Sequence, residues 1–303
     1  MFLQASFLNS KQLIDAKMFG NIQPISSGIL DDIKMRIKEG KIKYHNTDLY
    51  KSDIRDMCVV KNKGIVTVSY DKKQVALFQD LGEGYCDYEM TGVKKPDEYR
   101  GNRDHFYISP RSVAYNHKTD KFYITDSSGG KLLMTDGYLR HISKTIKYSD
   151  HKFFGIESVS CNDSYVYVSV VGTGKVEVYS HDLNRNVDAF NLGYRPEIIT
   201  VSNTTLCVST SENVYFYDIK TKALKSFHKM NFGAVSYISP FFFVYKSKKI
   251  HCYDEDGNLI DEIDAERLFN EYDPYDGYMG FYRDSLIISQ NSEQRLIELT
   301  LDI

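Results

Sequence analysis

Residues 159–179 read VSCNDSYVYVSVVGTGKVEVY, and this stretch decides the fold. It contains three short apolar runs, separated by one turn rich in Asn, Asp and Ser and a second rich in Gly and Thr. Apolar residues alternate with polar ones in these runs, and most of them are β-branched or aromatic. That pattern predicts short β-strands joined by tight turns.

The same module recurs along the chain. The middle run appears six times, centred on Val68, Ile124, Val168, Val208, Val244 and Ile288. Successive centres are 56, 44, 40, 36 and 44 residues apart, with a mean of 44. A weaker fourth strand follows an Asp- and Gly-rich turn in several modules, as in residues 259–263. Three or four strands per module, repeated six times, predict an all-β, six-bladed β-propeller. A pair of β-sandwiches is the alternative.

The first and last modules suggest how the ring closes. The last module ends at Ile303, directly after its third strand, so its fourth strand has to come from elsewhere. Residues 34–44 alternate with period 2, and we expect them to pair with the last blade and to bury Met35, Ile37 and Ile42. The propeller would then span residues 31–303.

Residues 1–30 are expected to form a helical or linker segment. Apolar positions at Leu3, Phe7, Ile14 and Met18 predict a short amphipathic helix over residues 2–19. This helix would be either the end of a coiled coil, through which the chain could oligomerise, or a helix packed on the side of the ring.

Composition narrows the class of protein. The 303 residues are 42% hydrophobic and carry a net charge of -3, values that exclude a disordered chain and argue against a strongly basic nucleic-acid binder. No apolar run reaches the ~18 residues of a membrane span, and the first residues lack the basic region of a signal peptide. No membrane partner is expected. The cysteines have no C-x-x-C spacing, which predicts free thiols and a cytoplasmic location; they are Cys58, Cys86, Cys161, Cys207 and Cys252.

Several phrases resemble NHL repeats. Residues 109–114 (SPRSVA) resemble the proline-led first strand of that repeat, and residues 195–199 (RPEII) repeat the phrase. Residues 122–127 (FYITDS), followed by KLL at 131–133, resemble its second strand, polar turn and third strand. Residues 54–59 (IRDMCV), with QVALF following later in the module, look like the first blade of tripartite-motif proteins that carry a C-terminal NHL propeller.

This resemblance implies an NHL-like propeller. Such a propeller would recognise the substrates of a ubiquitin ligase or act as a scaffold. The N-terminal helix would then be the tail of a coiled coil. The chain departs from the family pattern, because no Asn-His-Leu triplet precedes a third strand and nothing corresponds to the RING and B-box zinc modules. Some NHL propellers bind single-stranded RNA, and this is the alternative that the resemblance leaves open.

The sequence shows no catalytic constellation. Small hydroxyl residues recur where the second strands end, and we expect them to line the channel and to satisfy backbone groups; they are Ser69, Thr125, Ser169, Ser209 and Ser289. No His recurs near them as a base for a nucleophile. The Asp-rich segment at 254–258 is expected to be a hairpin turn rather than a calcium loop. We therefore expect no enzyme activity, no cofactor and no metal, with a metal-dependent propeller hydrolase or lyase as the rival reading.

Basic residues gather on one predicted face. Loops between second and third strands and segments that enter first strands open on the same side of a propeller. Together they supply the candidate binding residues Arg55, Lys72, Lys73, Arg111, Lys131, Lys175, Tyr194, Arg195, Lys248 and Lys249. The turns on the opposite side are rich in Asp and Glu. We expect the basic face to bind an acidic segment of a protein partner, with a single-stranded RNA backbone as the alternative.

Overall fold

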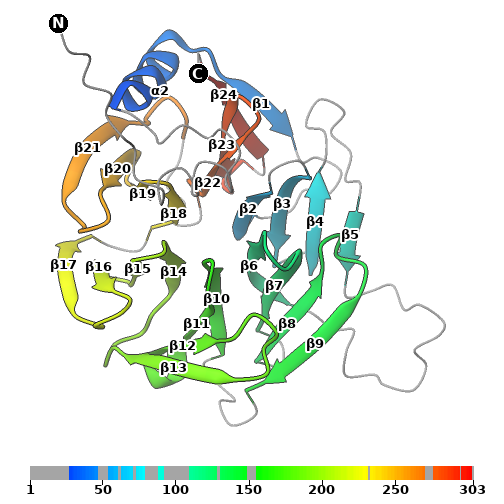
Figure 1. The fold of residues 1–303 in the computed structure, drawn as a ribbon. Coiled ribbons are helices and arrows are strands. Elements are labelled where there is room, and N and C mark those ends of the chain that lie inside the picture. The colour runs from blue at the N-terminus through cyan, green and yellow to red at the C-terminus, as the bar shows by residue number, and fades with distance from the viewer. Residues whose placement is uncertain are drawn as a thin grey trace, which may run out of the picture.

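Six four-stranded antiparallel sheets stand as blades around a central axis (Figure 1). The structure is a computed structural model, and it describes residues 27–46, 54–60, 63–70, 73–78, 88–91, 109–127, 130–148, 155–230, 233–269, 276–293 and 295–301. The predicted all-β, six-bladed propeller is confirmed.

Each blade is a meander whose first strand lies nearest the axis. Blades 1 to 3 consist of β2 (Asp56–Val60), β3 (Gly64–Ser69), β4 (Gln74–Phe78) and β5 (Tyr88–Thr91); β6 (Pro110–Asn116), β7 (Lys121–Asp126), β8 (Lys131–Asp136) and β9 (Ile142–Lys147); and β10 (Ile156–Cys161), β11 (Val166–Val170), β12 (Lys175–Tyr179) and β13 (Asn186–Asn191). Blades 4 to 6 consist of β14 (Ile198–Val201), β15 (Thr205–Ser209), β16 (Asn213–Asp218) and β17 (Leu224–Lys229); β18 (Val235–Ile238), β19 (Phe241–Lys246), β20 (Lys249–Tyr253) and β21 (Leu259–Asp264); and β22 (Met279–Tyr282), β23 (Ser285–Gln290), β24 (Arg295–Thr300) and β1 (Lys43–Asn46). A 3-10 turn, η3 (Val171–Thr173), joins β11 to β12.

The apolar core lies between neighbouring blades. Strand β11 shows why the middle strands read as almost continuous apolar runs. Val168 packs towards blade 2, whereas its neighbour Tyr167 packs towards blade 4, and both side chains are buried. Because successive side chains point to opposite faces of a sheet, a strand covered on both faces needs apolar residues at nearly every position.

Short polar side chains on the innermost strands link the blades to one another. In each case a serine Oγ accepts a hydrogen bond from a backbone N–H of the next blade. These bonds join Ser112 to Val159, Ser158 to Ile199 and Ser236 to Met279, at 3.0, 3.1 and 2.8 Å. Since backbone groups facing the channel would otherwise be left without partners, these serines serve the architecture.

Three of the hydroxyl residues at the ends of the second strands also bond to backbone groups, whereas Ser209 Oγ is buried without a hydrogen-bond partner among the described residues. Ser169 Oγ accepts a hydrogen bond from the Ser158 N–H at 2.8 Å, and Ser289 Oγ accepts one from the Tyr278 N–H at 3.0 Å. Thr125 Oγ1 donates to the carbonyl oxygen of Glu157 at 2.9 Å.

Blade 6 is completed by a strand from the N-terminal side of the chain, but this strand begins later than the sequence suggests and shares only Lys43 and Tyr44 with the expected segment 34–44. The strand that pairs with β24 is β1, in the register Lys43↔Glu298 to Asn46↔Arg295. Residues 34–39, expected to be part of this strand, belong instead to helix α2 (Ser27–Glu39), and Met35 is 41% exposed rather than buried.

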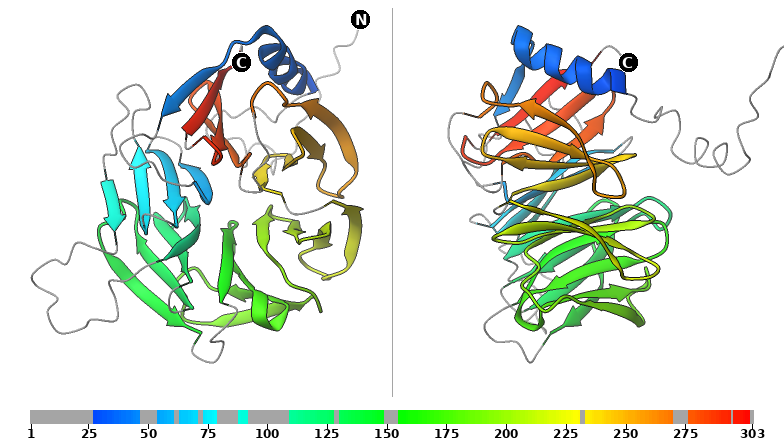
Figure 2. Two further views of the ribbon diagram at one scale, coloured as in Figure 1. Left: turned by 180° about the vertical axis from the view of Figure 1, so that it is seen from behind. Right: turned by 90° about the vertical axis from the view of Figure 1, so that its left-hand side faces the viewer.

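Helical spacing explains this correction. Leu30, Ile33 and Ile37 lie three and four positions apart, on one helix face, and all three are buried against blades 5 and 6. The helix ends at Gly40, which has φ +70°. Its N–H bonds to the Ile37 carbonyl at 3.2 Å, and the Lys41 N–H bonds to the Arg36 carbonyl at 3.1 Å, as in a Schellman motif. Figure 2 shows α2 on the outer edge of the ring, beside β21 and β24.

The helix predicted over residues 2–19 lies outside the described residues. Within the described part of the chain, no helix has both the length and the apolar character needed to cross a membrane. Cys58, Cys161, Cys207 and Cys252 are free thiols, and Cys86 falls outside the described residues.

Candidate functional site

Three arginines from the predicted set gather at one mouth of the central channel. Arg55 immediately precedes β2, Arg111 lies in β6 and Arg195 precedes β14, so all three stand where inner strands begin. In a meander blade the start of the first strand and the turn between the second and third strands open on the same side. We call this side the arginine face, and Arg55, Arg111 and Arg195 the arginine cluster.

The cluster is organised by an aromatic ring and a carboxylate. The guanidinium carbon of Arg111 lies 4.1 Å from the centre of the Tyr70 ring, and that of Arg55 lies 6.0 Å from the same centre. Arg111 Nε is 3.7 Å from Glu157 Oε2 and donates a hydrogen bond to Ser127 Oγ at 3.4 Å. Tyr70 follows β3 directly, so adjacent blades supply the platform and the charges.

Two carboxylates at this mouth resist ionisation. Burial raises the pKa of Glu157 above its ordinary value, although Arg111, Arg195 and Arg55 all act to lower it. Burial likewise raises the pKa of Glu197, against the attraction of Arg195. Protonation of these two carboxyls increases the net positive charge of the site.

Asp56 lies next to Arg55 in sequence but is buried in the wall of the channel. Its Oδ2 accepts hydrogen bonds from Ser112 Oγ at 2.5 Å and from the Val113 N–H at 2.9 Å. Its Oδ1 accepts one from the Met57 N–H at 2.7 Å. Burial nevertheless raises the pKa of Asp56 to about 7, because these three bonds do not replace the lost water. Asp56 bridges blades 1 and 2 and is a buried acid that titrates near neutral pH.

The lysines of the predicted set do not join the arginine cluster as a group. Lys131 and Lys175 begin the third strands β8 and β12, two strands outward from the channel. Lys248 Nζ lies 3.8 Å from Glu266 Oε1, and Lys249 forms an ion pair with Glu262. Acidic neighbours therefore neutralise part of the basic charge expected on blade 5.

Two further members of the set have different positions. Lys73 is an exposed turn residue with φ 54°, and Lys72 lies outside the described residues. Tyr194 does not lie against an arginine. Its ring stacks on Tyr215, with centroids 4.4 Å apart, and its hydroxyl lies 2.6 Å from that of Tyr217. Tyr194 belongs to an aromatic stack of blade 4, and this contact sets it apart from Tyr70.

Sequence reasoning overlooked Glu157 and Glu197. Both stand at the repeat position of Arg111, because IESV at 156–159 aligns with PRSV at 110–113, and PEII at 196–199 aligns with both. An alignment of the blades on their first strands would have revealed this alternation of sign. The channel mouth is therefore a mixed-charge site, with three cations and two acids whose pKa values are raised by burial.

We expect this site to bind anions more tightly as the pH falls. As the pH falls from 7.5 towards the ordinary range of carboxyl groups, Glu157 and Glu197 take up protons before free carboxyls do, because burial raises their pKa values, whereas an Asp-rich peptide stays ionised. The affinity for such a peptide should rise with this fall in pH, as measured by fluorescence anisotropy. Glu157→Gln should bind more tightly at pH 7.5 and lose most of this pH dependence. An unchanged pH profile in that variant would assign the effect to other groups.

No metal centre emerges from the described residues, in which no group of three or more His, Cys, Asp or Glu side chains is placed to hold an ion.

No protein-family model matches the chain, and no curated protein matches it either. Among solved structures, the chain is similar to the crystal structure of Myxococcus xanthus glutaminyl cyclase, with a TM-score of 0.44 and 12% sequence identity. The match covers 64% of this chain and 91% of that one.

Proposed function

We propose that the protein is a non-catalytic interaction module that binds an acidic segment of a protein partner at the arginine cluster. The observation that carries this proposal is the convergence of Arg55, Arg111 and Arg195, from three different blades, on one channel mouth around Glu157. Guanidinium groups bind carboxylates through paired N–H donors, and a rigid ring holds them in place before the ligand arrives. Such an arrangement favours recognition rather than chemistry.

The kind of partner follows from the resemblance of the blades to NHL repeats. In tripartite-motif proteins, a propeller of this type selects the substrate of a ubiquitin ligase. The repeated SPRSVA-like phrases place Arg111 and Glu197 at equivalent positions in their blades, so the charged mouth is built from the same segments that carry the resemblance. We propose the same division of labour here, with this chain as the recognising part.

Charge reversal in the cluster tests the proposal. A fluorescein-labelled decapeptide of alternating Asp and Ser serves as probe, at 50 mM and at 150 mM salt. We expect Arg111→Glu to weaken binding at least tenfold, about 1.4 kcal/mol, because it removes one cation and adds an anion beside Glu157. Arg195→Glu should act in the same direction. A wild-type protein that does not bind the peptide at 50 mM salt would overturn the proposal.

The matched control is Arg185→Glu. This exposed arginine lies in the turn between β12 and β13, on the face opposite the cluster, so the variant makes the same change in net charge. Its binding should equal that of the wild type. A uridine oligonucleotide is titrated in parallel. Tighter binding of this RNA, with an affinity that falls steeply between the two salt concentrations, would favour the RNA-binding alternative.

A further inference from the structure

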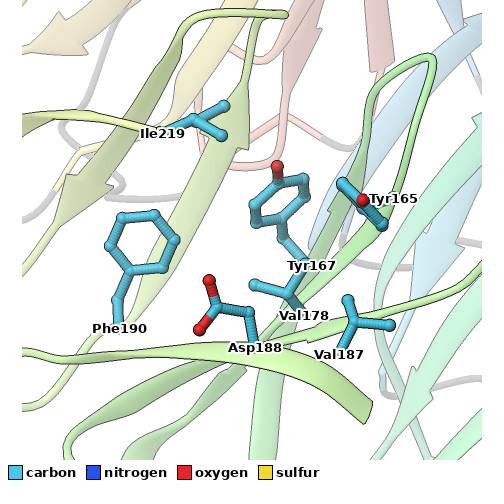
Figure 3. Close-up of a pocket in the computed structure, with 7 residues that line it drawn as sticks. All are labelled: Tyr165, Tyr167, Val178, Val187, Asp188, Phe190 and Ile219. Atoms are coloured by element: carbon cyan, nitrogen blue, oxygen red, sulfur yellow. The ribbon is translucent and has the colours of Figure 1, made fainter. Parts of the chain in front are cut away.

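A recess between blades 3 and 4 has a chemistry that the arginine cluster does not explain. It has a volume of about 140 Å³ and is lined by Tyr165, Tyr167, Val178, Val187, Asp188, Phe190 and Ile219 (Figure 3). Tyr165 precedes β11, in the turn after the first strand, and Ile219 follows β16, in the turn after the third strand. Both turns open on the side opposite the arginine face, so the recess is a separate site.

Strand register places one carboxylate among aromatic and apolar side chains. Tyr167 pairs with Val178, and Val178 pairs with Asp188, so these three side chains share the face of blade 3 that packs on blade 4. Phe190 follows two residues later on the same face. Tyr167 is 1% exposed and Phe190 is 3% exposed, so both are fixed by packing, whereas Tyr165 is 40% exposed and forms an open wall. Asp188 interrupts this otherwise hydrophobic face.

A lysine of blade 4 already shows which ligands this surface attracts. Lys222 Nζ lies over the ring of Phe190, 5.8 Å from its centre, and donates a hydrogen bond to Asp188 Oδ1. That hydrogen bond is the first cause of a lowered pKa for Asp188, so the carboxylate is ionised at neutral pH. The exposed fraction of the Lys222 side chain is 38%, as expected for a cation at the rim of the recess rather than inside it.

Aromatic faces and a single carboxylate are complementary to an alkylated ammonium ion. Aromatic rings attract cations through their negative faces, and quaternary or methylated ammonium groups are held in aromatic cages in this way. A free lysine ammonium is strongly hydrated and is costly to transfer to an apolar recess. Methylation lowers that cost while keeping the charge.

We propose that the recess formed by Tyr165, Tyr167, Asp188 and Phe190 binds a methylated lysine side chain of a protein partner. The dimethylated form fits best, because it keeps one N–H to donate to Asp188 and presents two methyl groups to the rings. Lys222 competes for the same carboxylate from the rim. The site is independent of the arginine cluster, so either proposal can fail without the other.

The test uses the amino-acid amides of Nα-acetyl-lysine with zero, two or three Nε-methyl groups, titrated against the intact protein. Binding is followed by the upfield ring-current shift of the methyl protons in NMR spectra and by competition between the three amides. We expect a saturable shift for the dimethylated probe, a weaker one for the trimethylated probe, and at least tenfold weaker binding of unmodified lysine. No saturable shift with either methylated probe would overturn the proposal.

Four variants locate the effect. Asp188→Asn should weaken binding of the dimethylated probe at least fivefold, and weaken the trimethylated probe less, because only the former donates to the carboxylate. Tyr165→Ala should weaken both probes, and Lys222→Gln should tighten both by removing the competing cation. Asp284→Asn, at an exposed turn of blade 6, is the control for net charge and should change nothing. Equal affinities in wild type, Asp188→Asn and Tyr165→Ala would place the binding elsewhere.

Discussion

Deletion of residues 1–46 should prevent the ring from forming a stable monomer. The deletion removes β1, which pairs with β24 over four residues, and helix α2, which buries Leu30, Ile33 and Ile37. Each of these three side chains contributes about 2 kcal/mol through burial, and each lost ladder hydrogen bond about 1 kcal/mol. The total approaches the ~5–15 kcal/mol that stabilises a whole domain. Thermal melts followed by circular dichroism and the apparent mass on size exclusion report the result.

Two side-chain contacts also join β1 to β24. His45 Nε2 lies 2.6 Å from Glu298 Oε2, and the guanidinium carbon of Arg295 lies 4.0 Å from the centre of the Tyr44 ring. Deletion of residues 1–20 keeps α2, β1 and all these contacts, so its melting temperature should match that of the full chain. Equal melting temperatures for the two deletions would show that β1 and α2 do not hold the ring closed.

A pair of point variants avoids the risk that a truncated chain simply aggregates. Ile33→Ala leaves a cavity against blades 5 and 6 and should lower the free energy of unfolding by ~2–4 kcal/mol. Met35→Ala, on the exposed side of the same helix, should change it by less than ~0.5 kcal/mol. A larger loss of stability in Met35→Ala than in Ile33→Ala would indicate that residues 34–39 form the strand that the sequence alone suggests.

Asp56→Asn should change how stability depends on pH. The pKa of Asp56 is 3.8 as a free group and about 7 in the folded protein, so between these values the folded state holds a proton that the unfolded chain has lost. The contribution of this group to stability is therefore complete below about pH 4 and is lost as the pH rises to about 7. A rise of this size in pKa corresponds to a loss of about 4 kcal/mol over that range.

Urea titrations at several pH values between 4 and 8 measure this effect. With its amide oxygen in the place of Oδ2, the asparagine side chain still accepts hydrogen bonds from Ser112 Oγ and the Val113 N–H, so the bridge between blades 1 and 2 is retained. Its amide nitrogen then takes the place of Oδ1 and gives up only the hydrogen bond from the Met57 N–H. The variant should be more stable than the wild type at pH 8, by up to about 4 kcal/mol, and the two should converge at low pH. Asp284→Asn controls for a generic loss of charge. Parallel curves for wild type and Asp56→Asn would refute the assignment.

The propeller could be predicted from the sequence because every blade has to bury both faces of its middle strands. Strands covered on both faces, such as β11, must be mostly apolar, so a mostly apolar run recurs in every blade. The closing segment was harder, since Met35 and Ile37 alternate with basic residues as in a strand, as do Ile42 and Tyr44, while Leu30, Ile33 and Ile37 keep helical spacing. Both patterns are present in the local sequence, and tertiary packing on blades 5 and 6 selects the helix.

The candidate site was predictable only in part. Topology alone brings the starts of inner strands together, so Arg55, Arg111 and Arg195 could be placed on one face from their position in the repeat. The neutralising partners of Lys248 and Lys249 come from later parts of blade 5, and the ion pairs depend on side-chain reach across that blade. The raised pKa of Asp56 arises from burial, which a sequence does not state.

The antiparallel pairing of β1 with β24 also decides how the ring responds to tension. Lys43 is the first residue of β1. It pairs with Glu298, which lies close to the C-terminal end of β24. A force that pulls the two chain ends apart therefore acts at one end of this strand pair, once α2 has been detached. The residue pairs between β1 and β24 then break one after another. Under a shearing force they would all carry the load at the same time. The ring should thus open at low force when it is pulled by its ends.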